Sequence, residues 1–164
     1  MNPVIDVQVE APFEEQVDEA LLGEAARATL AQQGVEEPVE MTVVIVGDET
    51  IQALNRRFRD VDAPTDVLAF PHETRGPFVG APGLPRYLGD VVISYPRAEA
   101  QAQEAGHPVE AELRLLVVHG VLHLLGHDHA DPEEKARMWA AQEAVLRRLG
   151  YRPPTVDRRP QTED

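Results

Sequence analysis

Apolar positions divide the first part of the chain into short strands and helices. Val4 to Val9 alternates apolar and polar residues, and residues 41–47 (MTVVIVG) form a β-branched run, so both segments predict strands. Between them, apolar residues recur at helical spacing from Phe13 to Gln33, with Gly34 just beyond, which predicts one helix over this range. Asp48 then stands in a capping position before a short helix, IQALNRRF, with one apolar face.

The same pattern continues less regularly after this helix. Residues 59–66 predict a loop, and residues 67–70 and 90–95 predict two strands. These strands flank a stretch rich in proline and glycine, 72–86, which cannot hold regular structure and is expected to be a surface excursion. A further helix is expected over residues 96–103.

Two long helices close the pattern. Residues 109–126 are so apolar that their second half has no polar face, which predicts a central buried helix. Asp131 and Pro132 form an N-cap and a first helical position, so a last helix is expected through Leu149, ending at Gly150.

This order of elements lacks a regular alternation of strand and helix and therefore favours an α+β fold. We expect a small mixed sheet of about four strands packed against about five helices, with the central buried helix binding a metal. At 164 residues, one domain over 1–151 is expected, followed by a polar, proline-rich tail over 152–164.

Composition narrows the class of protein. No apolar run reaches the roughly 20 residues that a bilayer requires, and the N-terminus lacks the pattern of a signal peptide. We therefore expect a cytoplasmic protein without a membrane partner. The net charge of −14 argues against charge-driven binding of nucleic acid, so an RNA partner would need a local basic patch. Since the chain has no cysteine, histidine or carboxylate must hold any metal.

Histidines gather at the end of the central helix, in HGVLHLLGHDH over residues 119–129. His119 and His123 are one helical turn apart and so share a face, and Gly126 can end the helix and turn His129 back toward them. The string H-x-x-x-H-x-x-G-x-x-H has the ligand spacing of the metzincin zinc motif. We expect these three side chains to bind one Zn²⁺ per chain and to leave an open position, as catalytic zinc sites do.

The neighbours of these histidines leave alternatives open. Gly120 stands where the zincin motif has its glutamate base, so peptide hydrolysis by that mechanism is disfavoured. His127 is either a surface residue or a residue behind the metal ligands. Asp128 either orients a ligand imidazole or caps the loop.

The chain resembles the YbeY family of bacterial endoribonucleases, whose signature HGxLHLxGxDH is matched by residues 119–129. Further matching segments are LNRRFRDVDAPTDVLAFP at 54–71, LGDVVISYP at 88–96 and MWAAQEAVLRRLGY at 138–151. Ala69 stands where serine is common in the family. The resemblance implies zinc binding by the three histidines and places Arg59 in an active site that cleaves single-stranded RNA, in 16S rRNA 3′-end maturation and ribosome quality control, with ribosomal proteins as partners.

The residues themselves agree with an RNA substrate. Arg56, Arg57 and Arg59 form a positive island in an acidic chain, and a guanidinium suits bidentate contact with a phosphate. For Arg56 and Arg57, a solvated helix end that favours cations is an equally good interpretation. The leading hypothesis is a metal-dependent endoribonuclease. The alternatives are a ribosome assembly factor with a mainly structural zinc and a metallopeptidase-like hydrolase.

Overall fold

The computed structural model describes residues 3–72, 85–128 and 130–150. The strands are β1 (Val4–Val9), β2 (Val39–Val46), β3 (Val67–Pro71) and β4 (Arg86–Ser94). The helices are the 3₁₀ helix η1 (Ala11–Gln16) and α1 (Glu19–Gln32), α2 (Asp48–Arg59), α3 (Tyr95–Ala105), α4 (Val109–Leu124) and α5 (Pro132–Arg148).

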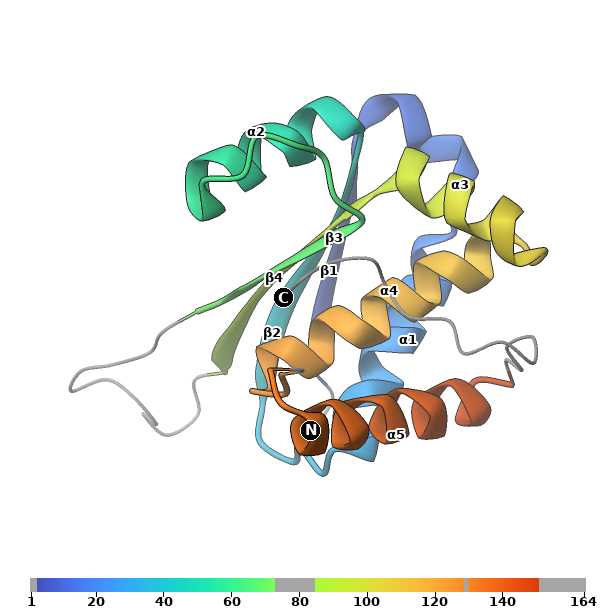
Figure 1. Cartoon of the computed structure of the whole chain (residues 1–164). Helices are drawn as coiled ribbons and strands as arrows, with labels where there is room; N and C mark the ends of the chain where they lie inside the picture. The colour runs from blue at the N-terminus through green and yellow to red at the C-terminus, as the bar shows by residue number, and fades with distance from the viewer. Residues whose placement is uncertain (1–2, 73–84, 129, 151–164) are drawn as a thin grey trace.

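The four strands form one mixed sheet in the order β1-β2-β4-β3 (Figure 1). β1, β2 and β4 run parallel, whereas β3 pairs antiparallel with β4 and is an edge strand of the described sheet. Within the described residues, a mixed sheet of four strands with five α-helices in one domain confirms the α+β class.

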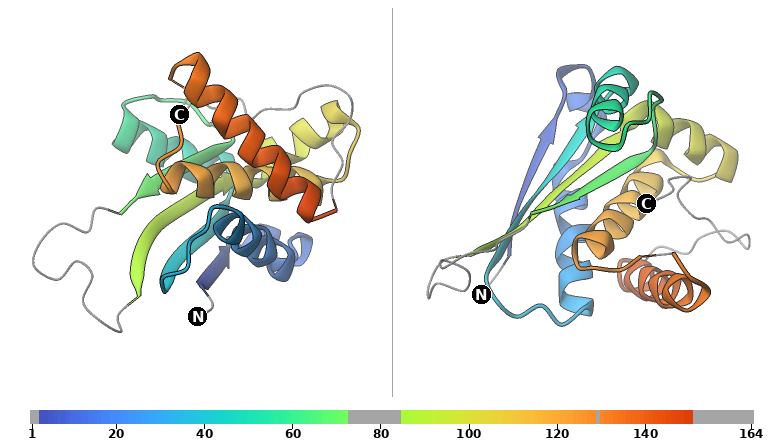
Figure 2. Two further views of the ribbon diagram at one scale, coloured as in Figure 1. Left: turned by 90° about the horizontal axis from the view of Figure 1, so that it is seen from below. Right: turned by 60° about the vertical axis from the view of Figure 1, so that its left-hand side comes forward.

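Alternate side chains along the strands point to opposite faces of the sheet, and each face is covered by a different hydrophobic cluster. On β4, Val91 and Ile93 face the main core, in which α1, α4 and α5 pack together (Figure 2). Val92, between them, belongs to a smaller cluster on the other face with Ile51 of α2 and Leu68 of β3. The sheet therefore separates α2 from α4, and the edge strand β3 packs against both helices.

The predicted central helix is confirmed. From Leu115 to Leu122 every residue of α4 is buried, because the helix lies between the sheet, α1, α3 and α5. Asp131 also caps α5 as expected, accepting a hydrogen bond from the backbone N–H of Glu134 at 2.8 Å. Among the described helices, none combines the length and apolar character needed to cross a membrane.

Three predicted boundaries were wrong. The single helix over 13–33 is two helices, because the Asp18 side chain accepts hydrogen bonds from Ala20 and Leu21 N–H and starts α1 anew. Gly47, not Asp48, is the N-cap of α2. The strand expected at 90–95 already begins at Arg86.

The expected surface excursion at 72–86 and the tail at 152–164 fall largely or wholly outside the described residues.

Candidate metal centre on the central helix

His119 and His123 lie side by side near the C-terminal end of α4. Their ring centroids are 4.7 Å apart and the ring planes make an angle of 71°. His119 is 1% exposed, and the Nε2 atoms of both rings are buried. The structure thus brings two imidazoles within reach of one ion, as their spacing of four residues along a helix predicts.

Two residues of α5 hold the His119 ring in place. The Nδ1–H of His119 donates to Oε1 of Gln142 at 3.2 Å, and the indole of Trp139 stacks on the ring with centroids 5.6 Å apart. Because an amide oxygen can only accept, the hydrogen of this bond sits on Nδ1, and in a neutral ring Nε2 is then the nitrogen whose lone pair can bind a metal. Such support behind a ligand histidine is usual in metal sites.

The chain turns sharply after the histidine pair. Gly126 has φ +98°, its N–H bonds to the carbonyl of His123, and the N–H of His127 bonds to the carbonyl of Leu122. This pair of bonds is the Schellman motif, which requires a left-handed residue after the helix. Gly126 thus ends α4 as predicted. His129, the third predicted ligand, lies outside the described residues, within which no three histidines or carboxylates form a metal cluster.

Gly120 allows α4 to approach the sheet closely. A Cβ atom at this position would lie 2.4 Å from Cγ1 of Val91 and 2.9 Å from Cγ2 of the same residue. A glutamate side chain therefore has no room at the position where the zincin motif carries its base. The glycine is required by helix–sheet packing, which supplies a structural reason for the difference from the peptidases.

His127 is hydrogen-bonded to the end of α1. Its Nε2–H donates to Oε1 of Gln33, just beyond α1, at 2.7 Å. Partial burial, and secondly the guanidinium of Arg137, lower the pKa of His127 below its ordinary value, so the neutral ring is favoured. Asp128 is exposed and lines a surface depression with Glu134 and Arg137.

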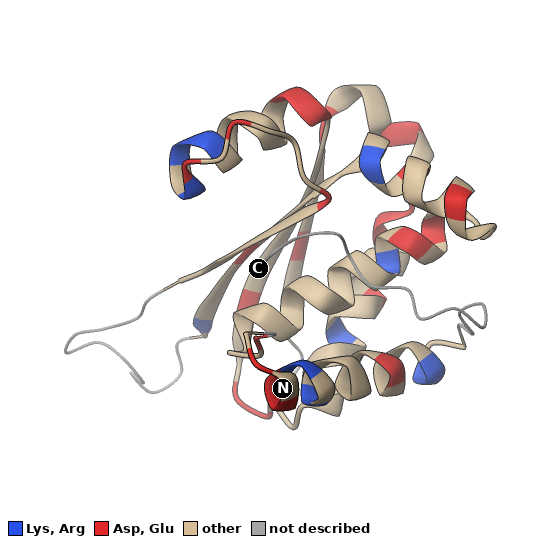
Figure 3. Cartoon of the chain, in the orientation of Figure 1, with Lys and Arg blue, Asp and Glu red and all other residues tan. Residues whose placement is uncertain are grey.

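The three arginines end α2, on the other face of the sheet from α4 (Figure 3). Arg59 is half-buried, whereas Arg56 and Arg57 are exposed. Strand β3 connects the C-terminal end of α2 with the histidine helix. Phe58 contacts Phe70 of β3, and β3 in turn packs against α4.

Sequence reasoning missed Gln142 and Trp139. Gln142 stands on the buried face of α5 with Met138 and Val145, and a polar residue on such a face was the available signal.

The donor set fits zinc. Two imidazoles on one helical face, one of them oriented by an amide oxygen, match the nitrogen ligands of zinc sites in proteins, and a third histidine follows three residues after the terminating glycine.

Fold and site together define a small α+β protein with a histidine pair on its central helix. A family model described as "Endoribonuclease YbeY" matches residues 5–150, and the chain belongs to that family.

Relatives named Endoribonuclease YbeY cover most of the chain. The protein from Roseiflexus sp. is 49% identical over 148 residues, which are 89% of this chain and 92% of the relative. The protein from Chloroflexus aggregans is 50% identical over 136 residues, 82% and 89% of the two chains. Among solved structures, the solution structure of TM1509 from Thermotoga maritima matches with a TM-score of 0.55 and 26% identity, covering 90% of this chain and 92% of that one.

Proposed function

We propose that this protein is a zinc-dependent endoribonuclease that cleaves single-stranded RNA and acts in 16S rRNA 3′-end maturation and ribosome quality control. The observation that carries the proposal is the close pair of His119 and His123 in a chain that matches the Endoribonuclease YbeY family over residues 5–150. The names of its relatives supply the reaction class, and ribosomal proteins are the proposed protein partners.

His119, His123 and His129 would hold the ion through imidazole nitrogens. When bound, a divalent ion acts as a Lewis acid that polarises a phosphoryl oxygen and favours attack on phosphorus. The contribution of the chain is to fix the ligands. Gln142 keeps the hydrogen of His119 on Nδ1, and Trp139 restricts the tilt of the ring.

Arg59 is the proposed partner of the scissile phosphate. A guanidinium stays protonated throughout the physiological range and offers two parallel N–H groups to a phosphate, so it stabilises negative charge that grows on the phosphoryl oxygens. Arg59 is less exposed than Arg56 and Arg57, and partial burial strengthens such an interaction.

RNA cleavage by matched variants tests the proposal. Single-stranded rRNA fragments are incubated with wild-type protein, with a chelator, and with the variants His123→Ala and Arg59→Ala. The chelator and His123→Ala should abolish cleavage, and Arg59→Ala should lower kcat by about 10²- to 10³-fold. Arg147→Ala, an exposed arginine on α5, is the control and should cleave normally. Undiminished cleavage by both site variants would assign the activity to another site or to a contaminant.

One observation favours a second candidate function, an assembly factor with a structural zinc. His119 is almost completely buried, as ligands of structural sites are. In that case chelation unfolds the protein and abolishes binding to ribosomal proteins, and the intact protein does not turn over RNA. A metallopeptidase remains disfavoured because Gly120 faces Val91. Turnover of a generic peptide would restore that hypothesis.

A further inference from the structure

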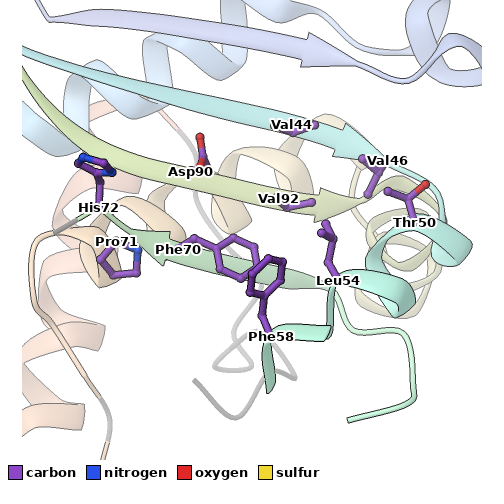
Figure 4. A pocket seen from close by; sticks show the side chains of 10 residues that line it. All are labelled: Val44, Val46, Thr50, Leu54, Phe58, Phe70, Pro71, His72, Asp90 and Val92. Carbon is purple, nitrogen blue, oxygen red and sulfur yellow. The ribbon is translucent and has the colours of Figure 1, made fainter. Parts of the chain in front are cut away.

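An apolar groove opens between α2 and the face of the sheet that α4 does not cover. Its floor comes from β2, β3 and β4 and its wall from α2 (Figure 4), with Val44, Val46, Leu54, Phe58, Phe70 and Val92 among the lining residues. The groove has a volume of about 490 Å³, which lies within the range of small-ligand sites.

Large apolar side chains remain exposed at one end of this groove. Among the described residues only three large hydrophobic side chains are exposed, and two of them, Phe58 at 57% and Val61 at 43%, are at or just after the end of α2. Phe58 packs against Phe70 edge to face, with centroids 5.3 Å apart. An aromatic pair with an open ring at the rim of a groove is a surface on which a flat ligand can stack.

A cationic group borders the same rim. The guanidinium carbon of Arg57 lies 5.2 Å from the centre of the Phe58 ring. Arg57 has no ion-pair partner within the part of the chain that the structure describes. In a chain of net charge −14, such an arginine beside an exposed aromatic ring favours a ligand that is both flat and anionic.

We propose that this groove binds one nucleotide of a single-stranded RNA, with the base against Phe58 and Phe70 and a flanking phosphate on Arg57. An unpaired base offers a flat apolar face next to a phosphate, whereas the bases of a duplex are already stacked on each other. The inference rests on the proposed function. A bound RNA would then run from the histidine site, around the edge strand β3, into the groove. β3 packs against α4 and also contributes Leu68 to the cluster that contains Ile51 of α2.

Binding of a short fluorescent single-stranded RNA, measured by anisotropy with chelator present to prevent turnover, tests the base contact. Phe58→Ala should weaken binding about 5- to 150-fold, the range measured for loss of one stacked base. Phe58→Trp should retain wild-type affinity because it preserves the stacking surface. Phe58 is 57% exposed, so Phe58→Ala should lower the melting temperature only slightly, through the lost contact with Phe70, and Phe58→Trp should leave it unchanged. The same RNA annealed to its complement should bind weakly to every form.

The salt dependence of binding tests the phosphate contact. Arg57→Ala should reduce the slope of log K against log salt by about 0.7, because one phosphate is no longer neutralised. The matched control, Arg147→Ala, changes net charge equally on α5 and should leave the slope unchanged. Equal slopes for the two variants, or unchanged affinity of Phe58→Ala, would overturn the inference.

The outcomes separate this inference from the proposed function. Metal-dependent cleavage with an unaltered KM and affinity in the Phe58 and arginine variants would refute RNA binding by the groove and leave the nuclease assignment intact. Loss of RNA affinity in these variants, in a protein that never cleaves RNA, would support the groove and refute the nuclease. Unchanged RNA affinity with lost binding of ribosomal proteins would make the groove a protein-docking site and contradict the proposal.

Discussion

At the scale of single residues, the most informative contact is the hydrogen bond between His119 and Gln142. Both side chains are buried, at 1% and 4% exposure, and they come from different helices. Such a bond restricts both the tautomer and the orientation of the imidazole. The position of His119 relative to its neighbour His123 is therefore fixed before any ligand arrives.

Replacing Gln142 tests this role directly. Gln142→Leu should weaken zinc binding about 10- to 100-fold, as loss of groups behind a ligand histidine usually does. Gln142→Glu should bind zinc at least as well as wild type, because its carboxylate accepts the same Nδ1–H. Zinc affinity is measured by competition with a coloured chelator, and the melting temperature of each metal-free form reports the purely structural effect. Equal zinc affinity of the Leu and Glu variants would reject the role.

The sequence predicted the histidine pair but not its support. His119 and His123 follow from helical periodicity, since residues four apart share a face whatever the fold. Gln142 and Trp139 meet His119 only because α5 crosses α4 in a particular register, which local pattern does not encode. The sequence also placed Phe58 on the apolar face of its helix, but the structure leaves this side chain exposed. Periodicity shows which residues share a face, and does not show whether another element covers that face.

At the scale of elements, the contact between α4 and β4 sets the depth of the histidine helix. Gly120 fits against Val91 with no space for a methyl group. Pushing the helix outward would change the position of His119 relative to α5.

A single methyl group at this contact should therefore be costly. Gly120→Ala should destabilise the protein by about 1–3 kcal/mol, the usual cost of overpacking a core. Gly23→Ala on α1 is a matched control, because its Cβ would meet only the flexible tip of Arg27 at 3.1 Å. That control should be neutral or stabilise by roughly 0.5–1 kcal/mol, since alanine favours a helix. Urea unfolding measures both, and equal stabilities would show that α4 does not need the close contact.

The carboxylate of Glu10, the residue after β1, is hydrogen-bonded to the start of α2. Glu10 accepts hydrogen bonds from the N–H of Gly47 at 3.0 Å and from the hydroxyl of Thr50 at 2.7 Å. Glu10→Ala should cost about 1–2 kcal/mol, since it removes two hydrogen bonds to a charged acceptor. Glu14→Ala, at an exposed position of η1, should have almost no effect on thermal unfolding. A melting temperature unchanged by Glu10→Ala would show that these two hydrogen bonds do not stabilise the fold.

Helix starts were the elements that the sequence predicted least well. The apolar repeat continues from Val17 to Ala20, yet the Asp18 side chain accepts hydrogen bonds from two backbone N–H groups and divides the segment. At α2, Asp48 is a favoured N-cap residue type and was the predicted cap, yet Gly47 holds that position. The choice depends on Glu10, which arrives from a different strand.

At the scale of the whole molecule, the class of fold was predictable and the strand order was not. Four apolar runs and five helical segments define an α+β protein from pattern alone. That β4 inserts between β2 and β3 depends on contacts between distant segments. The consequence matters for function, because β3 becomes an edge strand between the histidine helix and the groove under α2.

The most direct test of the account is zinc content and RNA cleavage measured on one preparation. Protein stripped of metal should cleave no single-stranded RNA, and cleavage should return in proportion to added zinc up to about one equivalent per chain. His123→Ala should neither retain the ion nor recover activity. A metal-free preparation that cleaves RNA at the full rate would contradict the central claim.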